Sequence, residues 1–120
     1  MNTVQLIGNL TRDPELRHTT SGTAVCTIAI AVDRRKRKGE PQDPVYVDVV
    51  TWGAQAENVA DHLAKGRRVA VIGRLEFRRW NDAEQRPHSK HEVVANEVQF
   101  LDPPRRGGAA AEPAYGEEPA

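Results

Sequence analysis

Apolar side chains alternate with others along most of this chain, and this alternation gives way once to the spacing of a helix. Between Ala56 and Leu63 the apolar residues stand at positions i, i+3, i+4 and i+7, as on one face of an amphipathic helix. On both sides of this segment the period is two, which places successive side chains on opposite faces of a strand. The pattern predicts an all-β fold with one short helix.

Five strands are predicted, three before the helix and two after it, at residues 4–10, 24–32, 45–52, 67–80 and 91–101. Residues 11–22 and 81–87 are polar and contain turn-forming residues. Gly8 indicates a bend or bulge in the first strand, and Gly66 suits the left-handed residue that follows a helix. This is the element order of the OB-fold, a five-stranded Greek-key barrel with its helix between strands three and four. Other small β-barrels share the same count.

The length of 120 residues suits one domain, expected at residues 1–102. Residues 103–120 begin with two prolines and are mostly Arg, Gly, Ala, Glu and Pro. They cannot bury enough apolar surface to order, so they are expected to form a disordered tail. The 17 basic and 17 acidic residues cancel, and any electrostatic footprint must therefore come from local clusters.

The predicted fourth strand carries the most informative pattern of charge and aromatic residues. Alternation places Arg74, Arg78 and Trp80 on one face, and Leu75 and Phe77 with the apolar residues of the other. Cations that follow a phosphate backbone, beside a ring that stacks on a base, suit sequence-tolerant binding of a single strand. Taken alone, the segment fits an ordinary edge strand with a half-buried tryptophan and a solvated charged face equally well.

The third predicted strand adds two more aromatic residues, Tyr46 and Trp52, on the face opposite its valines. With Trp80 they form the predicted set of base-stacking residues. Basic residues surround these strands, beginning with an unbroken run at 34–38. The predicted phosphate-binding residues are Arg34, Arg35, Lys36, Arg74, Arg78, Arg79 and Arg86.

The residues do not favour an enzyme. The four histidines have no metal-binding spacing, the lone Cys26 adds no second soft ligand, and no phosphate-cradling GxxxxGK[ST] loop is present. His62 on the helix is expected at the surface, and Asp13-Pro14-Glu15 is more simply a turn than a catalytic carboxylate pair. We therefore expect no catalytic residue, no metal and no cofactor.

Cysteine usage and hydropathy indicate a cytoplasmic protein. Cys26 lies in an apolar run and is expected to be a buried, inert thiol, which fits a reducing compartment. No apolar stretch approaches the roughly 20 residues of a membrane span. The first residues enter a strand directly, without the regions of a signal peptide.

With these residues in view, the chain resembles the bacterial and mitochondrial single-stranded DNA-binding protein family. The likeness extends from Thr3 to Leu101 and is carried by several blocks in the same order. These blocks are residues 4–10 with 13–15, Thr51-Trp52-Gly53, residues 63–66, Gly73-Arg74-Leu75 with Arg78-Arg79-Trp80, and residues 92–95 with Val98.

The resemblance implies sequence-independent coating of single-stranded DNA in replication, repair and recombination. Family stacking positions match Tyr46, Trp52 and Trp80, whereas a further family aromatic would fall near Lys36, where this chain is basic. Family members usually carry a long tail closed by an acidic, apolar tip. Here the sequence ends Gly116-Glu117-Glu118-Pro119-Ala120 without a phenylalanine, which argues against recruitment of replication and repair partners through the tail.

The resemblance also implies a homotetramer, for which the residues give a physical reason. Strand 24–32 has small or apolar side chains on both faces, and strand 91–101 nearly does. A five-stranded barrel has one interior, so such strands need cover from outside, and a symmetric partner provides it. Val47 stands where the family often has a polar interface residue.

Two other functions fit the predicted fold. One is a protein-interaction OB domain, such as a primosome accessory subunit, in which nucleic acid is secondary. The other is an RNA-binding OB domain, distinguished by recognition of the 2′-hydroxyl. A hydrolytic nuclease is more distant, because the sequence offers no cluster of metal ligands.

Overall fold

The computed structural model describes residues 1–34, 39 and 43–101. Its elements in chain order are β1 (Val4–Leu10), β2 (Glu15–His18), β3 (Ala24–Val32), β4 (Val45–Trp52), α1 (Gly53–His62), β5 (Arg68–Asn81) and β6 (Pro87–Phe100). The predicted disordered tail, 103–120, lies outside the described residues, as does most of the basic run that includes Arg35 and Lys36.

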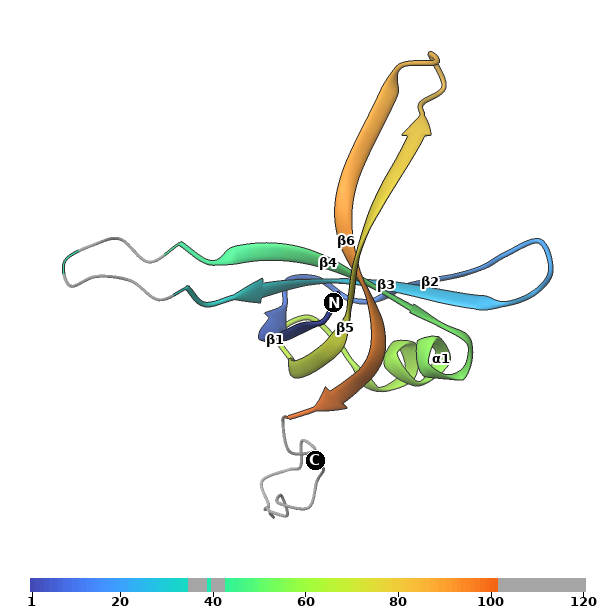
Figure 1. Ribbon diagram of the computed structural model, residues 1–120. Coiled ribbons are helices and arrows are strands. Elements are labelled where there is room, and N and C mark those ends of the chain that lie inside the picture. Colours follow the sequence, from blue (N-terminus) through green and yellow to red (C-terminus); the bar gives the residue numbers. More distant parts are fainter. Residues whose placement is uncertain (35–38, 40–42, 102–120) are drawn as a thin grey trace.

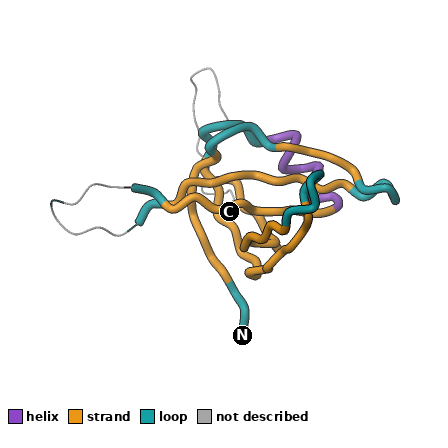
Figure 2. Tube along the Cα trace, turned by 90° about the horizontal axis from the view of Figure 1, so that it is seen from above, coloured by secondary structure: helices purple, strands orange, loops and turns teal. Residues whose placement is uncertain are grey.

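Five of the strands form a closed ring in the order β1-β5-β6-β4-β3, which a pairing between β1 and β3 completes (Figures 1 and 2). The ring pairs are antiparallel except β4 with β6, which run parallel over Val49–Val93 and Val50–Val94. The prediction of an all-β OB-fold barrel with one helix is confirmed. β2 is an outer strand that pairs with β3.

The barrel closes at the carboxyl end of β1, where Gly8 permits a close approach. β1 pairs with β5 from Val4 to Asn9 and turns to pair with β3 at Asn9 and Leu10. A Cβ at Gly8 would lie 2.6 Å from the carbonyl oxygen of Ala31, so a larger residue would push β1 away from β3. The bend predicted at Gly8 thus lies close to the point where β1 changes from pairing with β5 to pairing with β3.

Alternating residues of the strands fill the barrel, and α1 covers one end of it. Ile28 and Ile30 of β3 and Val49 of β4 are fully buried, as the alternation predicted. The helix contributes Ala56 and Val59, which are also fully buried and belong to the same core. Apolar area removed from water in this interior is the main stabilising term of the fold.

A β-bulge separates the barrel part of β5 and β6 from a hairpin that projects beyond it (Figure 1). Ile72 pairs with Glu97 and Gly73 with Ala95, so β6 has one extra residue at this point. A side chain at Gly73 would clash with the carbonyl group of Val94. The bulge therefore needs glycine, and the strands beyond it follow a new direction.

The side chain of Gln55 on α1 holds the bulge from outside. Its Oε1 accepts a hydrogen bond from the amide of Val98 at 3.0 Å, and its Nε2 donates to the carbonyl oxygen of Ala95 at 3.4 Å. These two groups flank the extra residue of β6, whose ladder bonds are interrupted there. The helix thereby fixes the point from which the hairpin projects.

One additional strand and two boundaries differ from the sequence predictions for a physical reason. β2 was expected to be part of a polar connection, and all four of its residues are exposed, so no alternation could reveal it. β6 begins at Pro87 rather than residue 91, because its first residues pair in the exposed hairpin. α1 begins at Gly53, ahead of the first apolar residue that marked it. Gly66 has the expected positive φ, 92°.

Candidate nucleic-acid interface

The predicted stacking residues lie on one continuous outer face of the sheet. Side chains of directly paired residues point to the same side, and Val50 pairs with Val94, which pairs with Arg74. Alternation along each strand carries this face to Tyr46 and Trp52 on β4 and to the set Arg74, Arg78 and Trp80 on β5. Segments distant in sequence thus present their aromatic and basic side chains to the same side of the molecule.

The three aromatic residues differ in how open they are. The exposed fraction is 69% for Tyr46, 48% for Trp52 and 37% for Trp80. Trp80 is the least open because two neighbours contact its ring. The Arg78 guanidinium lies 4.4 Å from the ring centroid, and the His88 ring stacks at 5.4 Å with an interplanar angle of 18°. These contacts orient the indole before any ligand arrives.

Carboxylates accompany the cations of this face. Arg74 Nε lies 2.6 Å from Glu76 Oε2, and Arg78 Nε lies 3.4 Å from Glu92 Oε2. Lys90 of β6 also forms an ion pair with Asp48 of β4. A phosphate that binds either arginine must compete with a carboxylate already in place.

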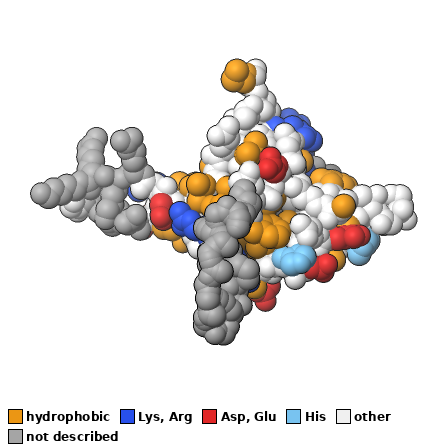
Figure 3. Space-filling view, turned by 90° about the horizontal axis from the view of Figure 1, so that it is seen from below, with side chains coloured by type: hydrophobic (Ala, Val, Ile, Leu, Met, Phe, Trp, Pro, Cys, Tyr) orange, Lys and Arg blue, Asp and Glu red, His pale blue; other side chains and the backbone are white. Residues whose placement is uncertain are grey.

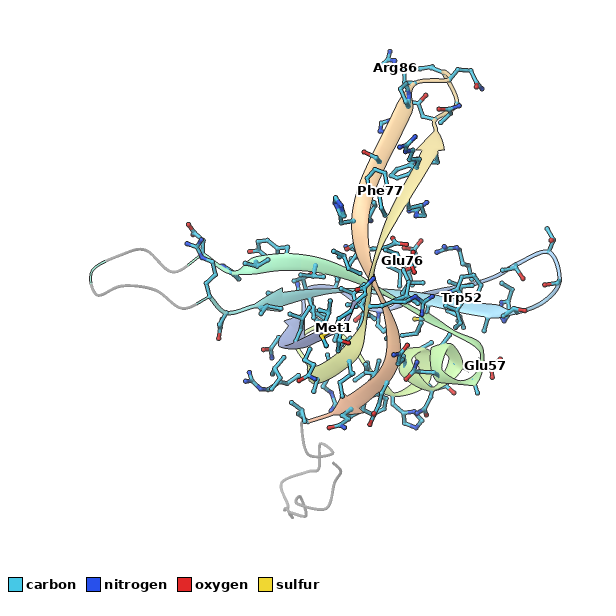
Figure 4. The ribbon with its side chains drawn as sticks, in the orientation of Figure 1. Met1, Trp52, Glu57, Glu76, Phe77 and Arg86 are labelled. Atoms are coloured by element: carbon cyan, nitrogen blue, oxygen red, sulfur yellow. The ribbon has the colours of Figure 1, made fainter. Side chains whose placement is uncertain are left out.

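The tip of the hairpin is organised by Asp82 (Figure 4, where Arg86 is labelled at the tip). Its Oδ1 accepts hydrogen bonds at 2.9 Å from the amides of Glu84 and Arg86, and its Oδ2 lies 2.9 Å from His88 Nε2. The bond with His88, followed by the backbone bonds, lowers the pKa of the Asp82 carboxyl below its ordinary value. Asp82 therefore links the turn to the imidazole that stacks on Trp80.

Arg86 lies at the tip of the β5–β6 hairpin, and Arg34 follows the end of β3. Arg86 is largely exposed and lies 3.2 Å from Glu84. Arg34 is exposed just after β3, in the connection to β4. Both positions leave the guanidinium accessible to a phosphate, while the predicted contacts of Arg35 and Lys36 lie outside the described residues.

Arg79 does not share the face of the other predicted arginines. It alternates with Arg78 and Trp80, and its guanidinium lies 5.4 Å from the centroid of the Phe77 ring. Phe77 and Leu75 were grouped with apolar Val71, yet they are 49% and 46% exposed, whereas Val71 is fully buried. Burial of this face of β5 ends at the bulge, because beyond it the strand extends out of the barrel and the same face no longer points into the core.

Three residues to which the sequence pattern assigned no role lie against the predicted site: Phe77 contacts Arg79, Asp82 bonds His88, and His88 stacks on Trp80. Asp82 sat in a stretch interpreted as a polar turn, and His88 was considered as a metal ligand and set aside. A signal was present for His88, because in a hairpin closed by a turn at 82–86 it lies opposite Trp80. Phe77 had no such signal, since alternation alone cannot show that the barrel ends before it.

The groove between α1 and β6 differs in charge from this face. It has a volume of about 530 Å³ and is lined by apolar and polar residues together with Glu57 and Asp61, without lysine or arginine. Figure 3 shows the corresponding side of the molecule, where acidic and histidine side chains gather near the helix. An anionic strand would be repelled there.

Cys26 and His62, the groups suited to other chemistry, lie apart from this face. Cys26 is fully buried, and its burial raises the pKa of the thiol, with the negative charge of Glu15 as the next cause. His62 is exposed, with its Nδ1 3.0 Å from the carbonyl oxygen of Asn58. Within the described residues there is no cluster of three or more His, Cys, Asp or Glu side chains that could hold a metal ion. The described helix is also too short to cross a membrane.

The model of the single-strand binding protein family matches residues 1–101. The chain is 44% identical over 103 residues to single-stranded DNA-binding protein 3 of Clostridium acetobutylicum, covering 85% of this chain and 72% of that protein. It is 47% identical to a single-stranded DNA-binding protein of Thermotoga maritima, covering 84% and 74% of the two chains. Identity to single-stranded DNA-binding protein A of Bacillus subtilis is 42%, covering 92% of this chain and 65% of that protein.

Proposed function

This chain belongs to the single-strand binding protein family, and we propose that it binds and coats single-stranded DNA without sequence preference in replication, repair and recombination. The observation that carries the proposal is the shared outer face of β4 and β5. It combines three exposed aromatic rings with arginines, which is what base stacking and phosphate neutralisation require.

The proposed roles follow from the placement of each side chain. Tyr46, Trp52 and Trp80 offer ring faces to successive bases, and every base has a π-face, so the binding tolerates any sequence. The proposed phosphate contacts are Arg34, Arg35, Lys36, Arg74, Arg78, Arg79 and Arg86. Binding of this kind needs no catalytic residue and no cofactor, and we propose a non-enzymatic protein of the bacterial cytoplasm associated with the nucleoid.

We also propose that the chain assembles as a homotetramer. Ile7 of β1 and Val45 of β4 are 49% and 46% exposed. Val25 and Ala29, on the outer side of β3, are already buried within the single chain, so the expected need of this strand for cover by a partner is not borne out. Symmetric association would cover the exposed apolar surface of Ile7 and Val45. Sedimentation equilibrium on residues 1–102 tests the assembly, and a monomer mass at micromolar concentration would exclude it.

The function is tested by titration with poly-dT, followed by the fluorescence of Trp52 and Trp80. Stacked bases should quench both rings, and affinity should fall as salt rises, because each neutralised phosphate releases counterions with a log–log slope of about −0.7 per contact. Unchanged fluorescence at saturating DNA would refute stacking. Preferential displacement of the DNA by poly-U would favour an RNA-binding function instead.

A protein-interaction domain is the remaining alternative. It would retain its DNA binding after simultaneous replacement of Tyr46, Trp52 and Trp80 by alanine, because its nucleic-acid contacts would not depend on stacking. The proposed function requires instead that this triple variant lose most of its affinity for poly-dT while keeping its circular dichroism spectrum.

A further inference from the structure

The projecting hairpin has a second exposed face, opposite Trp80. On this face Leu75 pairs with Val93, Phe77 with His91 and Arg79 with Ser89. Leu75 and Phe77 are about half exposed although they continue the row of core residues that begins inside the barrel. Figure 4 shows Phe77 partway along the hairpin, between Glu76 near its base and Arg86 at its tip.

Phe77 is placed as a stacking platform rather than as a packed core residue. Its ring centroid lies 5.0 Å from that of His91 with an interplanar angle of 47°, and the Arg79 guanidinium lies 5.4 Å from it. An aromatic ring, an imidazole and a guanidinium therefore form one half-exposed cluster. On the other face, the Trp80 ring is likewise contacted by one guanidinium, that of Arg78, and one imidazole, that of His88.

A groove lined by His91 of this cluster lies next to the face described above. It has a volume of about 410 Å³, and its walls include Tyr46 of β4 and the side chains of Leu75 and His91 from the hairpin. It lies where β4 and β6 diverge beyond their short parallel pairing, and the ion pair between Lys90 and Asp48 spans the two strands there. Tyr46 thus lies both on the outer face and at the edge of a groove that reaches His91, the ring neighbour of Phe77.

The charges of the groove indicate what could occupy it. Its carboxylates, Asp48 and Glu92, already have cationic partners in Lys90 and Arg78. A second copy of the chain on this face would remove the Arg79 guanidinium from water, which is costly unless an anion meets it. A nucleic-acid strand supplies a flat base for the ring and a phosphate for the guanidinium together.

We propose that Phe77, with Arg79 and His91, forms a second base-binding surface, which a single strand reaches from Tyr46 through this groove. The strand would then contact both faces of the hairpin, with one base on Trp80 and another on Phe77. The inference rests on the proposed function, because it assigns an additional contact to the same ligand. It also explains why Arg79 lies away from the other predicted phosphate-binding arginines.

The test compares binding of a short and a long oligo-dT, of about 8 and about 30 nucleotides, by fluorescence anisotropy. A single OB-fold binds about 4–16 nucleotides, so the short strand can be held by the outer face alone. Phe77→Leu should weaken binding of the long strand by about tenfold and of the short strand by less than about twofold, within the range known for loss of one stacked base. Phe77→Tyr keeps the ring and should bind like the unmodified protein.

Leu16→Ala is the matched control, since it removes half-exposed apolar surface from β2, outside the groove and the hairpin, without removing a ring. A loss equal to that of Phe77→Leu would show that packing matters and would overturn the proposal. Unchanged binding by Phe77→Leu would also overturn it, as would a change in its sedimentation mass, which would assign the face to contacts between copies.

Failure of the proposed function is distinguishable in the same experiment. If the unmodified protein bound neither oligonucleotide, both proposals would fall. If it bound both strands and Trp80→Ala weakened them, while Phe77→Leu did not, the outer face would stand and the second surface would be refuted.

Discussion

The barrel and the hairpin that projects from it are built from the same two strands but stabilised by different interactions. Inside the barrel, Val69 and Val71 of β5 are fully buried in the core. Beyond the bulge, Phe77 and Trp80 of the same strand are 49% and 37% exposed and are held by ring contacts with neighbouring cations and histidines. The proposed binding groups thus lie where they add little to the core, and substitutions should separate stability from binding.

The largest effect is expected in the barrel. Ile28 is fully buried, and Ile28→Ala should lower the free energy of unfolding by about 2–5 kcal/mol, because it removes apolar contacts and leaves a cavity. Urea denaturation measures this loss, while titration with oligo-dT under folding conditions should give nearly unchanged affinity. A large loss of affinity in the folded variant would show that barrel packing and the binding face are coupled.

On the hairpin, a substitution should weaken DNA binding more than it lowers the free energy of unfolding. Trp80→Ala should weaken oligo-dT binding by about 1–3 kcal/mol, the range for loss of one stacked base. Its effect on the free energy of unfolding should be smaller than that of Ile28→Ala, because the ring is partly exposed and its neighbours are surface side chains. If the two variants unfolded at the same urea concentration, the hairpin would belong to the cooperative core.

The same contrast explains which parts of the fold could be predicted from sequence. Alternation located β3 and β4 because each places a row of apolar side chains in the core, and helical spacing located α1. It could not locate β2, whose residues are all exposed, or the start of β6 in the hairpin. Hydrophobic periodicity reflects which face of a strand is buried, so it gives no signal for a strand that is exposed on both faces.

For the candidate site, alternation grouped Arg74, Arg78 and Trp80 on one face correctly, since the strand keeps its period through the hairpin. It could not show that Glu76 and Glu92 would pair with those arginines, because these contacts depend on side-chain geometry and on cross-strand register. The placement of Phe77 outside the barrel depends on the bulge at Gly73, which one sequence does not reveal.

A smaller effect should follow from removing one competing carboxylate. Glu76 lies 2.6 Å from Arg74 on the proposed binding face, and Glu76→Gln should release the guanidinium for phosphate. Because an exposed ion pair is worth up to about 1 kcal/mol, affinity for oligo-dT should rise by a factor of about two to five at low salt. Glu57→Gln is the matched control, since this exposed residue lies on α1 (Figure 4). An equal rise in both variants would indicate a general change in net charge.

The smallest effect is expected at the hairpin tip, from protonation of Asp82. Its carboxylate bonds His88 and the turn amides, which lower its pKa from the ordinary 3.8. A depressed pKa means that the folded turn favours the ionised form, so the stabilisation is complete above about pH 4 and is lost as pH falls through the folded-state value. Loss of these bonds should free His88 from its position against Trp80, while the barrel stays folded.

The indole NH resonance of Trp80, followed by NMR from pH 6 to pH 2.5, measures this change. We expect it to shift only in the acidic part of the range, whereas Trp52, which lies on β4, should report little. Asp82→Asn, which cannot ionise, should remove the Asp82-dependent part of the shift. A transition that both tryptophans share, and that Asp82→Asn leaves in place, would instead mean that acid unfolds the barrel and the hairpin together, and the distinction between the two regions would fail at low pH.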